Sequence, residues 1–469
     1  MEVHYRGSGK VKYNNTDYQC HLYFSEDQGG IVIKICNITE FIGSFLELPV
    51  EIEYLCGQLD NGFNFVLYRS KRTDTPSRIF ANKTINEYVY ESQKIICGLT
   101  PILKNNFHFS KAIYKLSNII DWAGLSYFSL KDNMALITKE ETPEKLVYQN
   151  NDYSIVYKVA GSMLPFMPQD LLREKIELTQ NGYIEIVSKD EQKIAFFDDL
   201  FGKLRRLIEI STLTRLNVEG MDLFTNEITE TYGDKKISFP LHVYGTGIKI
   251  FEENEKESSL RRLSWISLPE LIEHNSIELY FEKYDRLEPV IELYLEPFYS
   301  TYSYRRVFLN LVQALETYHS RFVTNDLNQY KTRVNALTSD TNWANFLIAN
   351  SKGRKITLQS RIADLLLAEF KIYFDTGDIA RSDFPEVIAD TRNYYIHYDQ
   401  RIMDRGKVLS LDDLGIYNGV LIYMLEYYIL KELGFDNDIL ALQKKLSNRW
   451  GSVSQTLSIL QESKKKETA

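Results

Sequence analysis

The hydrophobic pattern of this 469-residue chain changes near residue 265. Before that point, short runs of β-branched and aromatic residues, such as 154–159 and 183–187, alternate with turn signals such as Asn181-Gly182. Runs of this kind indicate strands of a mostly antiparallel sheet. After Trp265 the apolar residues recur at helical spacing, which indicates helices. The sequence therefore predicts an α+β multidomain chain, with a β-rich N-terminal region followed by an all-α helical bundle.

Two helices are expected to interrupt the β-rich region. One covers roughly residues 110–127, and the other covers roughly residues 196–216, where leucine and isoleucine recur every three or four positions. If the β-rich region consists of two subdomains, the break between them is expected near residues 105–135.

The domain bounds follow from these changes in pattern. The β-rich region takes residues 1–264, a helical connector takes 265–300, and the helical bundle takes 301–460. The lysine-rich tail, residues 461–469, is expected to fray.

Local capping signals mark the helices of the bundle. Pro385 suits the first turn of a short helix that begins at Asp383. Ser410 and Asp413 form the capping box of the last long helix, and Gly434 is placed to end it. The segments with apolar residues at helical spacing are 305–322, 357–374, the short helix from 383, and 410–433.

Composition is that of an ordinary soluble protein, with 44% hydrophobic and 25% charged residues. No apolar run is long enough to span a bilayer, so no membrane partner is expected. The first residues lack the basic and apolar segments of a secretory signal, and we expect a cytoplasmic protein. The 4 cysteines all lie in the first hundred residues, fit no zinc spacing, and are expected to be reduced and mostly buried.

The net charge of −9 is unevenly distributed. Residues 301–469 carry 22 Lys and Arg against 20 Asp and Glu, a balance of +2, so the first 300 residues carry −11. Nucleic-acid binding is driven by neutralisation of phosphates, which makes the acidic part a poor general binder. Any contact with RNA should therefore be focused at one site in the C-terminal part.

One short motif in that part contains the residues needed for RNA cleavage: Arg392, Asn393 and His397. RNA supplies its own nucleophile, because its 2′-hydroxyl can attack the adjacent phosphorus and leave a 2′,3′-cyclic phosphate. His397 suits the proton transfer, since histidine moves protons near neutral pH. Arg392 suits the developing negative charge, because its planar fork of donors fits a phosphate. Asn393 would hold the phosphate or orient a neighbour, and no metal or other cofactor is expected.

Helical geometry constrains how this motif can work. Side chains five positions apart diverge by about 140° on an ideal helix. Either the helix ends or bends before His397, or each site combines residues from two subunits. Tyr394 and Tyr398 beside the motif are candidates for stacking on RNA bases, with packing in the core or in a dimer as the plainer alternative.

Plainer interpretations exist for the other candidates as well. Arg392 would then form an ion pair with one of three nearby carboxylates, those of Glu386, Asp390 and Asp399. Glu316, on the first helix of the bundle, is an auxiliary candidate that would tune His397 or hold Arg392. A surface charge is the equally open alternative for Glu316.

Residues 301–469 resemble a HEPN domain, a helical bundle found in many endoribonucleases. The resemblance is carried by the spacing of Arg392, Asn393 and His397 and by the order of the helices. A helix with Gln313-Ala314-Leu315-Glu316 comes first, the helix of 358–366 second, the motif next and the long capped helix last. The resemblance implies a homodimer in which two motifs meet across a two-fold axis.

The whole chain also resembles the ApeA group of bacterial anti-phage proteins, which combine a long β-rich N-terminal domain with a C-terminal HEPN domain. The tracts 116–122 and 265–271 add to this resemblance. It implies an effector that cleaves cellular RNA such as tRNA, with the N-terminal region sensing a phage-derived protein trigger. Some HEPN toxins carry a tyrosine two positions after the histidine, but Asp399 stands there, so no switch by tyrosine modification is inferred.

Two other functions remain open from the sequence. The chain could be a non-catalytic dimeric binding or sensor protein with a HEPN-like bundle. The 32 tyrosines are also compatible with a glycan-binding sheet.

Overall fold

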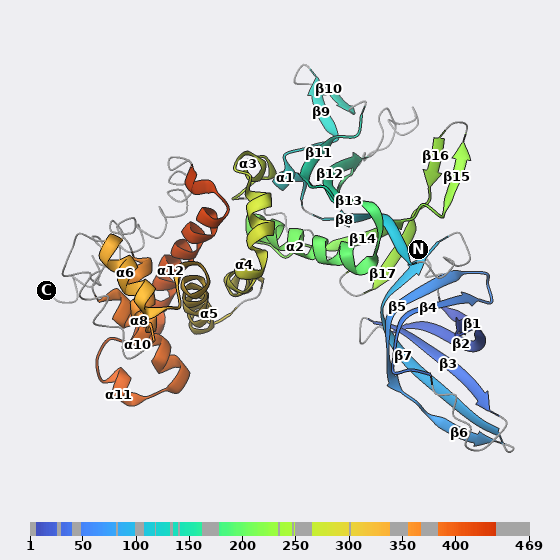
Figure 1. Cartoon of the computed structure of the whole chain (residues 1–469), viewed down its shortest axis with the longest axis horizontal. Coiled ribbons are helices and arrows are strands. Elements are labelled where there is room, and N and C mark those ends of the chain that lie inside the picture. Colours follow the sequence, from blue (N-terminus) through green and yellow to red (C-terminus); the bar gives the residue numbers. More distant parts are fainter. Residues whose placement is uncertain are drawn as a thin grey trace, which may run out of the picture. The chain divides into compact units, whose positions relative to one another are not determined.

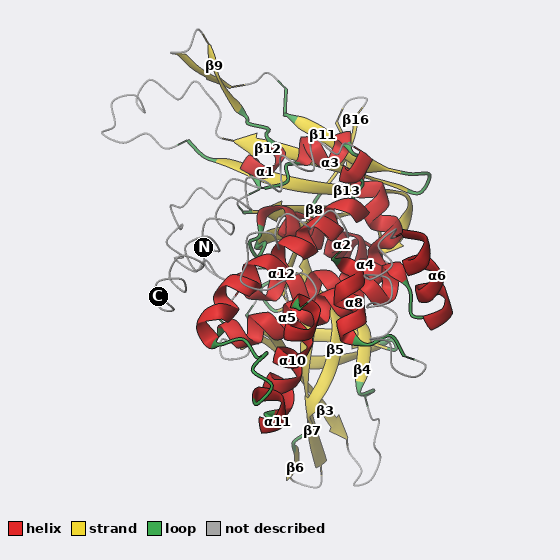
Figure 2. Cartoon of the chain, turned by 90° about the vertical axis from the view of Figure 1, so that its left-hand side faces the viewer, coloured by secondary structure: helices red, strands yellow, loops and turns green. Residues whose placement is uncertain are grey.

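The structure, a computed structural model, describes residues 6–25, 30–39, 48–80, 83–98, 107–117, 119–131, 135–138, 141–161, 178–232, 235–245, 248, 265–299, 302–337, 355–366 and 383–437. The chain forms two compact units. The β-rich unit comprises residues 1–205 and 216–263, and the helical unit comprises residues 206–215 and 264–469. The described strands all belong to the β-rich unit, where they are yellow in Figure 2.

Six strands of the β-rich unit close into a barrel. Hydrogen bonding runs from β7 through β3, β2, β1, β4 and β5 and back to β7, and every pair is antiparallel. The barrel strands, blue in Figure 1, are β1 (Gly7–Tyr13), β2 (Thr16–Ser25), β3 (Gly30–Thr39), β4 (Glu51–Leu59), β5 (Asn64–Asp74) and β7 (Lys83–Cys97). The antiparallel, β-rich N-terminal region predicted from the sequence is confirmed.

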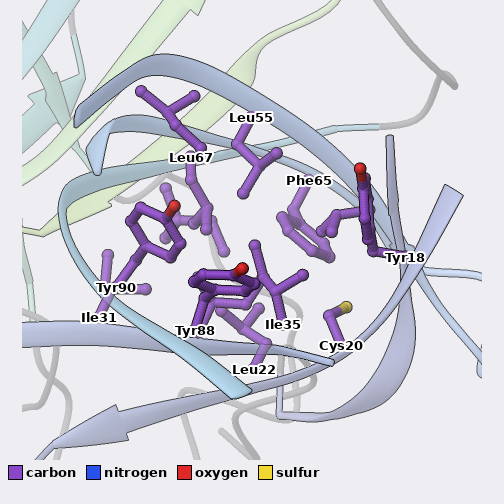
Figure 3. Packing of buried hydrophobic residues seen from close by; sticks show 14 of the residues in the cluster. Tyr18, Cys20, Leu22, Ile31, Ile35, Leu55, Phe65, Leu67, Tyr88 and Tyr90 are labelled. Carbon is purple, nitrogen blue, oxygen red and sulfur yellow. The ribbon is translucent and has the colours of Figure 1, made fainter. Parts of the chain in front are cut away.

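Side chains fill the interior of this barrel. Leu22, Leu55 and Leu67 are fully buried there, and the rings of Tyr88 and Tyr90 pack between them (Figure 3). A small barrel has an interior just wide enough for its own side chains. Burial of each leucine contributes about 1.5–3 kcal/mol, so the packed interior holds the six strands together.

The cysteines belong to this barrel and are free thiols. Cys20 and Cys97 are buried, whereas Cys36 and Cys56 are partly buried. Burial raises the pKa of the Cys20 thiol to about 12 and that of the Cys56 thiol to about 11. The structure thus agrees with unpaired thiols, of which Cys20 and Cys97 are buried as predicted.

The long strand β7 belongs both to the barrel and to a second row of strands. Its residues 84–92 pair with β3 of the barrel, and its residues 94–97 pair with β17. From β17 a second row continues through β14, β8, β13 and β12 to β11. These strands are β17 (Leu241–Gly245), β14 (Val218–Phe224), β8 (His108–Leu116), β13 (Gln180–Lys193), β12 (Tyr153–Gly161) and β11 (Glu144–Gln149).

Short elements complete the unit. β6 (Ser77–Phe80) pairs with β7, and two hairpins are formed by β9 (Phe128–Lys131) with β10 (Ala135–Thr138) and by β15 (Thr229–Tyr232) with β16 (Lys235–Ser238). The helix predicted at 196–216 is confirmed as α2 (Ile194–Thr212). The boundary between the two units falls within α2, after Arg205.

The helix predicted at residues 110–127 is wrong. Residues 108–116 form β8, in which every second side chain from Ala112 to Leu116 is buried. This strand pairs with β13 on one side and with β14 on the other, and these long-range hydrogen bonds override the local pattern. Only α1 (Ile120–Ala123) is helical, and it ends at Gly124, which has a φ of 65°.

A glycine permits the close approach of the paired strands β1 and β4 in the barrel. A Cβ added at Gly9 would lie 2.2 Å from the carbonyl oxygen of Gln58, so backbone would have to move. We expect Gly9→Ala to lower the free energy of unfolding by about 1–3 kcal/mol, as overpacking does. Gly202→Ala is the matched control, because Gly202 lies in α2 with open space around it. Alanine is more favourable than glycine inside a helix by ~1 kcal/mol, so this substitution should not destabilise the protein.

Denaturant midpoints of the full chain measure both changes. If Gly9→Ala unfolds at the same denaturant concentration as the unsubstituted protein, the close approach of β1 and β4 does not limit the barrel.

The helical unit is built around one central helix. α5 (Tyr304–Tyr318) contacts α4, α8, α10 and α12. The other elements are α3 (Leu268–Glu273), α4 (Ser276–Tyr299), the π-helical turn η2 (His319–Val323), α6 (Leu327–Leu337), α8 (Leu358–Leu365), α10 (Phe384–His397), α11 (Gln400–Met403), α12 (Leu411–Glu432) and the 3₁₀ turn η4 (Phe435–Asn437). The predicted helical C-terminal part is confirmed.

Polar contacts fasten α4 to the last turns of α12. The buried hydroxyl of Tyr294 donates to Glu426 at 2.7 Å, and the hydroxyl of Ser276 donates to the carbonyl of Leu433 at 2.6 Å. Buried polar groups of this kind require partners, so these bonds fix how the two helices align.

The capping signals in the sequence are confirmed. Ser410 accepts a hydrogen bond from the Asp413 N–H at 3.1 Å, and Pro385 lies in the first turn of α10. Gly434, with a φ of 84°, follows Leu433, the C-cap residue of α12. α8 begins after Thr357 as predicted, but residues 367–374 of that predicted helix lie outside the described residues. Within the described residues, no helix combines the length and apolar character needed to cross a membrane.

Candidate active site

α10 carries the whole Arg392–His397 motif. Its first turns are fixed in the bundle by Phe384 and Ile388, which are completely buried. Towards its end Arg392 and Asn393 are half-buried, whereas His397 is exposed. The motif thus lies where the helix leaves the core, with the histidine accessible to a large substrate.

The guanidinium of Arg392 has a neutral partner next to it. Its Nη1 donates to the Oδ1 of Asn393 at 3.1 Å. The nearby carboxylates have other partners: Glu386 pairs with Lys407, Asp390 with Arg405, and Asp399 with Arg401. In the part of the chain that the structure describes, Arg392 has no carboxylate within ion-pair distance.

The loop after α11 is hydrogen-bonded to buried side chains of α10. The hydroxyl of Thr391 accepts from the Leu409 N–H at 3.0 Å, and the hydroxyl of Tyr395 donates to the Leu409 carbonyl at 3.0 Å. Thr391, Tyr395 and Leu409 are all buried. These bonds fix the rotation of α10 about its axis, and with it the directions of the motif side chains.

α10 remains helical through His397. The following residue, Tyr398, has a φ of 51° and ends the helix, and its N–H donates to the Tyr394 carbonyl at 2.6 Å. The alternative in which the helix ends before His397 is therefore wrong, whereas a bend in the helix and a site shared by two subunits both stay predictions. On an ideal helix the side chains of Arg392 and His397 are about 140° apart.

The two candidate stacking residues lie together at this helix end. The ring of Tyr394 meets the ring of Tyr398 with centroids 5.6 Å apart, and Tyr398 is 54% exposed. Arg305, from the first turn of α5, donates from Nη1 to the hydroxyl of Tyr398 at 2.5 Å. Sequence reasoning missed Arg305, because nothing local relates it to a tyrosine 93 positions further along the chain.

Several large apolar side chains on α10 and on the helices α5, α11 and α12 are exposed. In the described part of the helical unit, the exposed large hydrophobic residues are Tyr304, Ile396, Tyr398, Met403 and Leu411. They come from the starts of α5 and α12, from the end of α10 and from α11. The ring of Tyr304 lies 3.6 Å from the position of a Cβ at Gly415, one turn after Leu411 on α12. We call this group the apolar rim of the motif.

Glu316 and His319 lie in another part of the unit. Glu316 acts electrostatically on Arg361 of α8. A role of Glu316 in tuning His397 or holding Arg392 stays a prediction. No group of three or more His, Cys, Asp or Glu side chains suited to a metal ion occurs among the described residues.

His319 is the centre of a buried polar network. Its Nε2 is 2.8 Å from the Oδ2 of Asp364, and its Nδ1 is 3.0 Å from the Nη1 of Arg361. Because arginine can only donate, Nδ1 must accept, and the proton is on Nε2. Arg333 donates to the other oxygen of Asp364. His319 and Asp364 are 0% and 1% exposed, so this histidine joins α5, α6 and α8 and does not reach a substrate.

The network predicts a pH dependence of stability. Burial lowers the pKa of His319 below its ordinary value, and the attraction of Asp364 opposes that shift only in part. A depressed histidine pKa means that the unfolded chain binds this proton first as the pH falls, so stability is lost below about pH 6.5. We expect the thermal midpoint to fall between pH 7.5 and pH 5.5, as measured by calorimetry.

His319→Gln is the matched variant for this prediction, because glutamine can still donate a hydrogen bond towards Asp364 but does not titrate. The fall in midpoint between the two pH values should become smaller in His319→Gln. An unchanged fall would assign the pH dependence to other groups.

Family models match both parts of the chain. A model described as Apea-like HEPN matches residues 309–439, which contain the whole motif. The fold and the motif therefore define the chain as a HEPN protein with a β-rich N-terminal region. A second model, described as ApeA N-terminal domain 1, matches residues 4–279, more than half of the chain. The chain belongs to the ApeA family.

Family membership gives the class of function: an anti-phage HEPN effector. HEPN domains are generally ribonuclease domains and commonly dimerise. Comparison with curated proteins and with solved structures found no significant match.

Proposed function

We propose that this protein is a metal-independent endoribonuclease of bacterial anti-phage defence, acting in the cytoplasm. Its substrate would be a cellular RNA such as tRNA. The β-rich region would restrain the helical unit until it binds a phage-derived protein. The observation that supports the proposal best is the arrangement on α10. An exposed histidine follows an arginine that lacks a carboxylate partner in the described residues, inside the segment that matches the HEPN model.

The chemistry needs one proton transfer and one site for negative charge. The 2′-oxygen attacks the adjacent phosphorus, the bond to the 5′-oxygen of the next nucleotide breaks, and a 2′,3′-cyclic phosphate and a 5′-hydroxyl result. His397 takes the proton from the 2′-hydroxyl or gives one to the departing 5′-oxygen. Arg392 stabilises the additional negative charge on the phosphate oxygens, which is commonly worth roughly 3–4 kcal/mol in a dry site. Asn393 holds the guanidinium through the 3.1 Å hydrogen bond.

Two copies of the chain would complete the site. In one copy Arg392 and His397 diverge by about 140°, so one phosphate is reached more easily by Arg392 of one subunit and His397 of the other. The apolar rim supports this, because exposed hydrophobic side chains next to a polar motif are typical of a surface that is covered in an assembly. The occupant that we propose for the rim is a second copy of the chain.

Incubation of the triggered protein with total RNA in excess EDTA tests the enzyme proposal. We expect cleavage to continue in EDTA, and the new 3′ ends to be cyclic phosphates. Cleavage that stops in EDTA and returns with magnesium would contradict the mechanism, as would 3′-hydroxyl ends.

A further inference from the structure

One arginine joins the last turn of α10 to the first turn of α5. The Nη1 of Arg305 donates to the hydroxyl of Tyr398 at 2.5 Å. Its guanidinium carbon lies 4.9 Å from the ring centre of Tyr395 and 5.6 Å from that of Tyr398. A guanidinium over aromatic rings at these distances is attracted to both of them. A single cation thus holds the two tyrosines on either side of the Ile396-His397 pair.

The backbone at Tyr398 depends on such a contact. Its φ of 51° is in the left-handed region, which is unfavourable for a residue with a side chain and is usually left to glycine or asparagine at a helix end. The side chain of Tyr398 must therefore contribute something that glycine cannot. The hydrogen bond from Arg305 and the ring contact with Tyr394 are the contributions that the structure shows.

Arg305 loses a hydrogen bond to hold this orientation. Its Nε is buried and has no hydrogen-bond partner in the described part of the chain. A buried donor without a partner costs free energy, and such groups in a folded protein call for an explanation. Here the orientation that leaves Nε unpaired is the one that directs Nη1 to Tyr398.

From these contacts we propose that Arg305 is a positioning residue for RNA cleavage. By fixing Tyr398 it fixes the end of α10, and thereby the direction in which the adjacent His397 leaves the helix. This proposal rests on the ribonuclease function proposed above. It requires that small displacements of His397 matter, and a misplacement of 1 Å can slow an enzymatic step by roughly 10²-fold.

The substitutions Arg305→Ala and Tyr398→Phe, alone and together, test the proposal in the full chain. We expect Arg305→Ala to lower kcat by about 10- to 10²-fold with little change in KM. Tyr398→Phe keeps the aromatic ring for stacking but removes the oxygen that accepts from Arg305, so it should lower kcat by about tenfold. The double variant should be no slower than Arg305→Ala, because both substitutions break the same contact.

Arg306→Ala is the matched control. Arg306 lies on the same turn of α5, where it pairs with Glu296 at 2.6 Å and covers the ring of Tyr302 at 4.2 Å. Its removal takes away the same charge and a similar ring contact without touching α10. We expect its kcat and KM to stay within about twofold of those of the unsubstituted protein.

Arg305→Lys separates positioning from folding. Lysine can still donate to Tyr398 but lacks the planar group that covers two rings, so kcat should recover in part. This variant and Tyr398→Phe also carry the test if Arg305→Ala does not fold.

Several outcomes would overturn the proposal. A rise in KM with unchanged kcat in Arg305→Ala would make Arg305 a direct contact of the RNA. A normal kcat in Tyr398→Phe, or an equal loss in Arg306→Ala, would show that the contact does not position His397. Failure of the proposed function is seen separately, because the unsubstituted protein and His397→Ala would then cleave RNA equally, and the positioning role would fail with it.

Discussion

His397→Ala is expected to slow RNA cleavage by about 10²–10⁴-fold, because the reaction loses its proton-transfer group. Arg392→Ala is expected to slow it by about 10²–10³-fold, because charge on the phosphate oxygens is no longer stabilised. His397 is exposed and Arg392 is half-buried without a described carboxylate partner, so neither change should unfold the protein. Initial rates of cleavage of one defined RNA by the triggered protein measure both effects.

Arg401→Ala provides the control for charge. Arg401 is 88% exposed and pairs with Asp399, two residues after His397. Its removal takes a positive charge from the same surface but leaves the motif intact, and cleavage should stay near the level of the unsubstituted protein. If His397→Ala and Arg392→Ala are folded and still give the full anti-phage effect, the non-catalytic binding function becomes the better account.

Asp364→Ala is expected to give the largest loss of stability in the helical unit. The Asp364 carboxylate accepts from buried His319 and from Arg333, and both would lose their acceptor. Breaking a buried pair in this way typically costs about 3–5 kcal/mol. Asp364→Asn, which keeps an oxygen acceptor but no charge, should cost less. Chemical denaturation followed by far-UV circular dichroism measures the change.

Glu296→Ala is the surface control for this experiment. Glu296 pairs with Arg306 where that arginine is 56% exposed, and such pairs contribute about 0–1 kcal/mol. If Asp364→Ala and Glu296→Ala lower the free energy of unfolding equally, the buried network does not hold α5, α6 and α8 together.

Local chemistry explains which parts of the fold could be predicted. The start of α12 at Ser410 and its end before Gly434 depend on hydrogen bonds and φ angles within a few residues, and both are readable in the sequence. The start of α10 near Pro385 is readable for the same reason. The change from strands to helices near residue 265 was predicted from periodicity alone.

Long-range pairing explains the parts that could not be predicted. In β8 the buried Phe109, Ala112 and Leu116 are three and four positions apart, which fits a helix as well as a strand. Only the neighbours β13 and β14 decide between them. Closure of the barrel depends in the same way on the pairing of β5 with β7, which the local sequence does not predict.

The candidate site shows the same division. Arg392, Asn393 and His397 are close in sequence and could be proposed together, whereas Arg305 comes from another helix and could be found only in the structure. His319 has no local feature that marks it as buried, and its hydrogen-bond partners, Asp364 and Arg361, are more than forty positions away. The domain bounds 1–264, 265–300 and 301–460 stay proposals.

Mixing two inactive variants tests most directly whether Arg392 and His397 of different subunits form one site. Arg392→Ala and His397→Ala chains with different tags would be co-expressed, and the mixed dimer isolated through both tags. A dimer of this kind contains one intact site if each site takes its arginine from one chain and its histidine from the other. The account predicts about half of the activity of the unsubstituted dimer. A mixed dimer as inactive as either variant alone, beside an active unsubstituted protein, would contradict it.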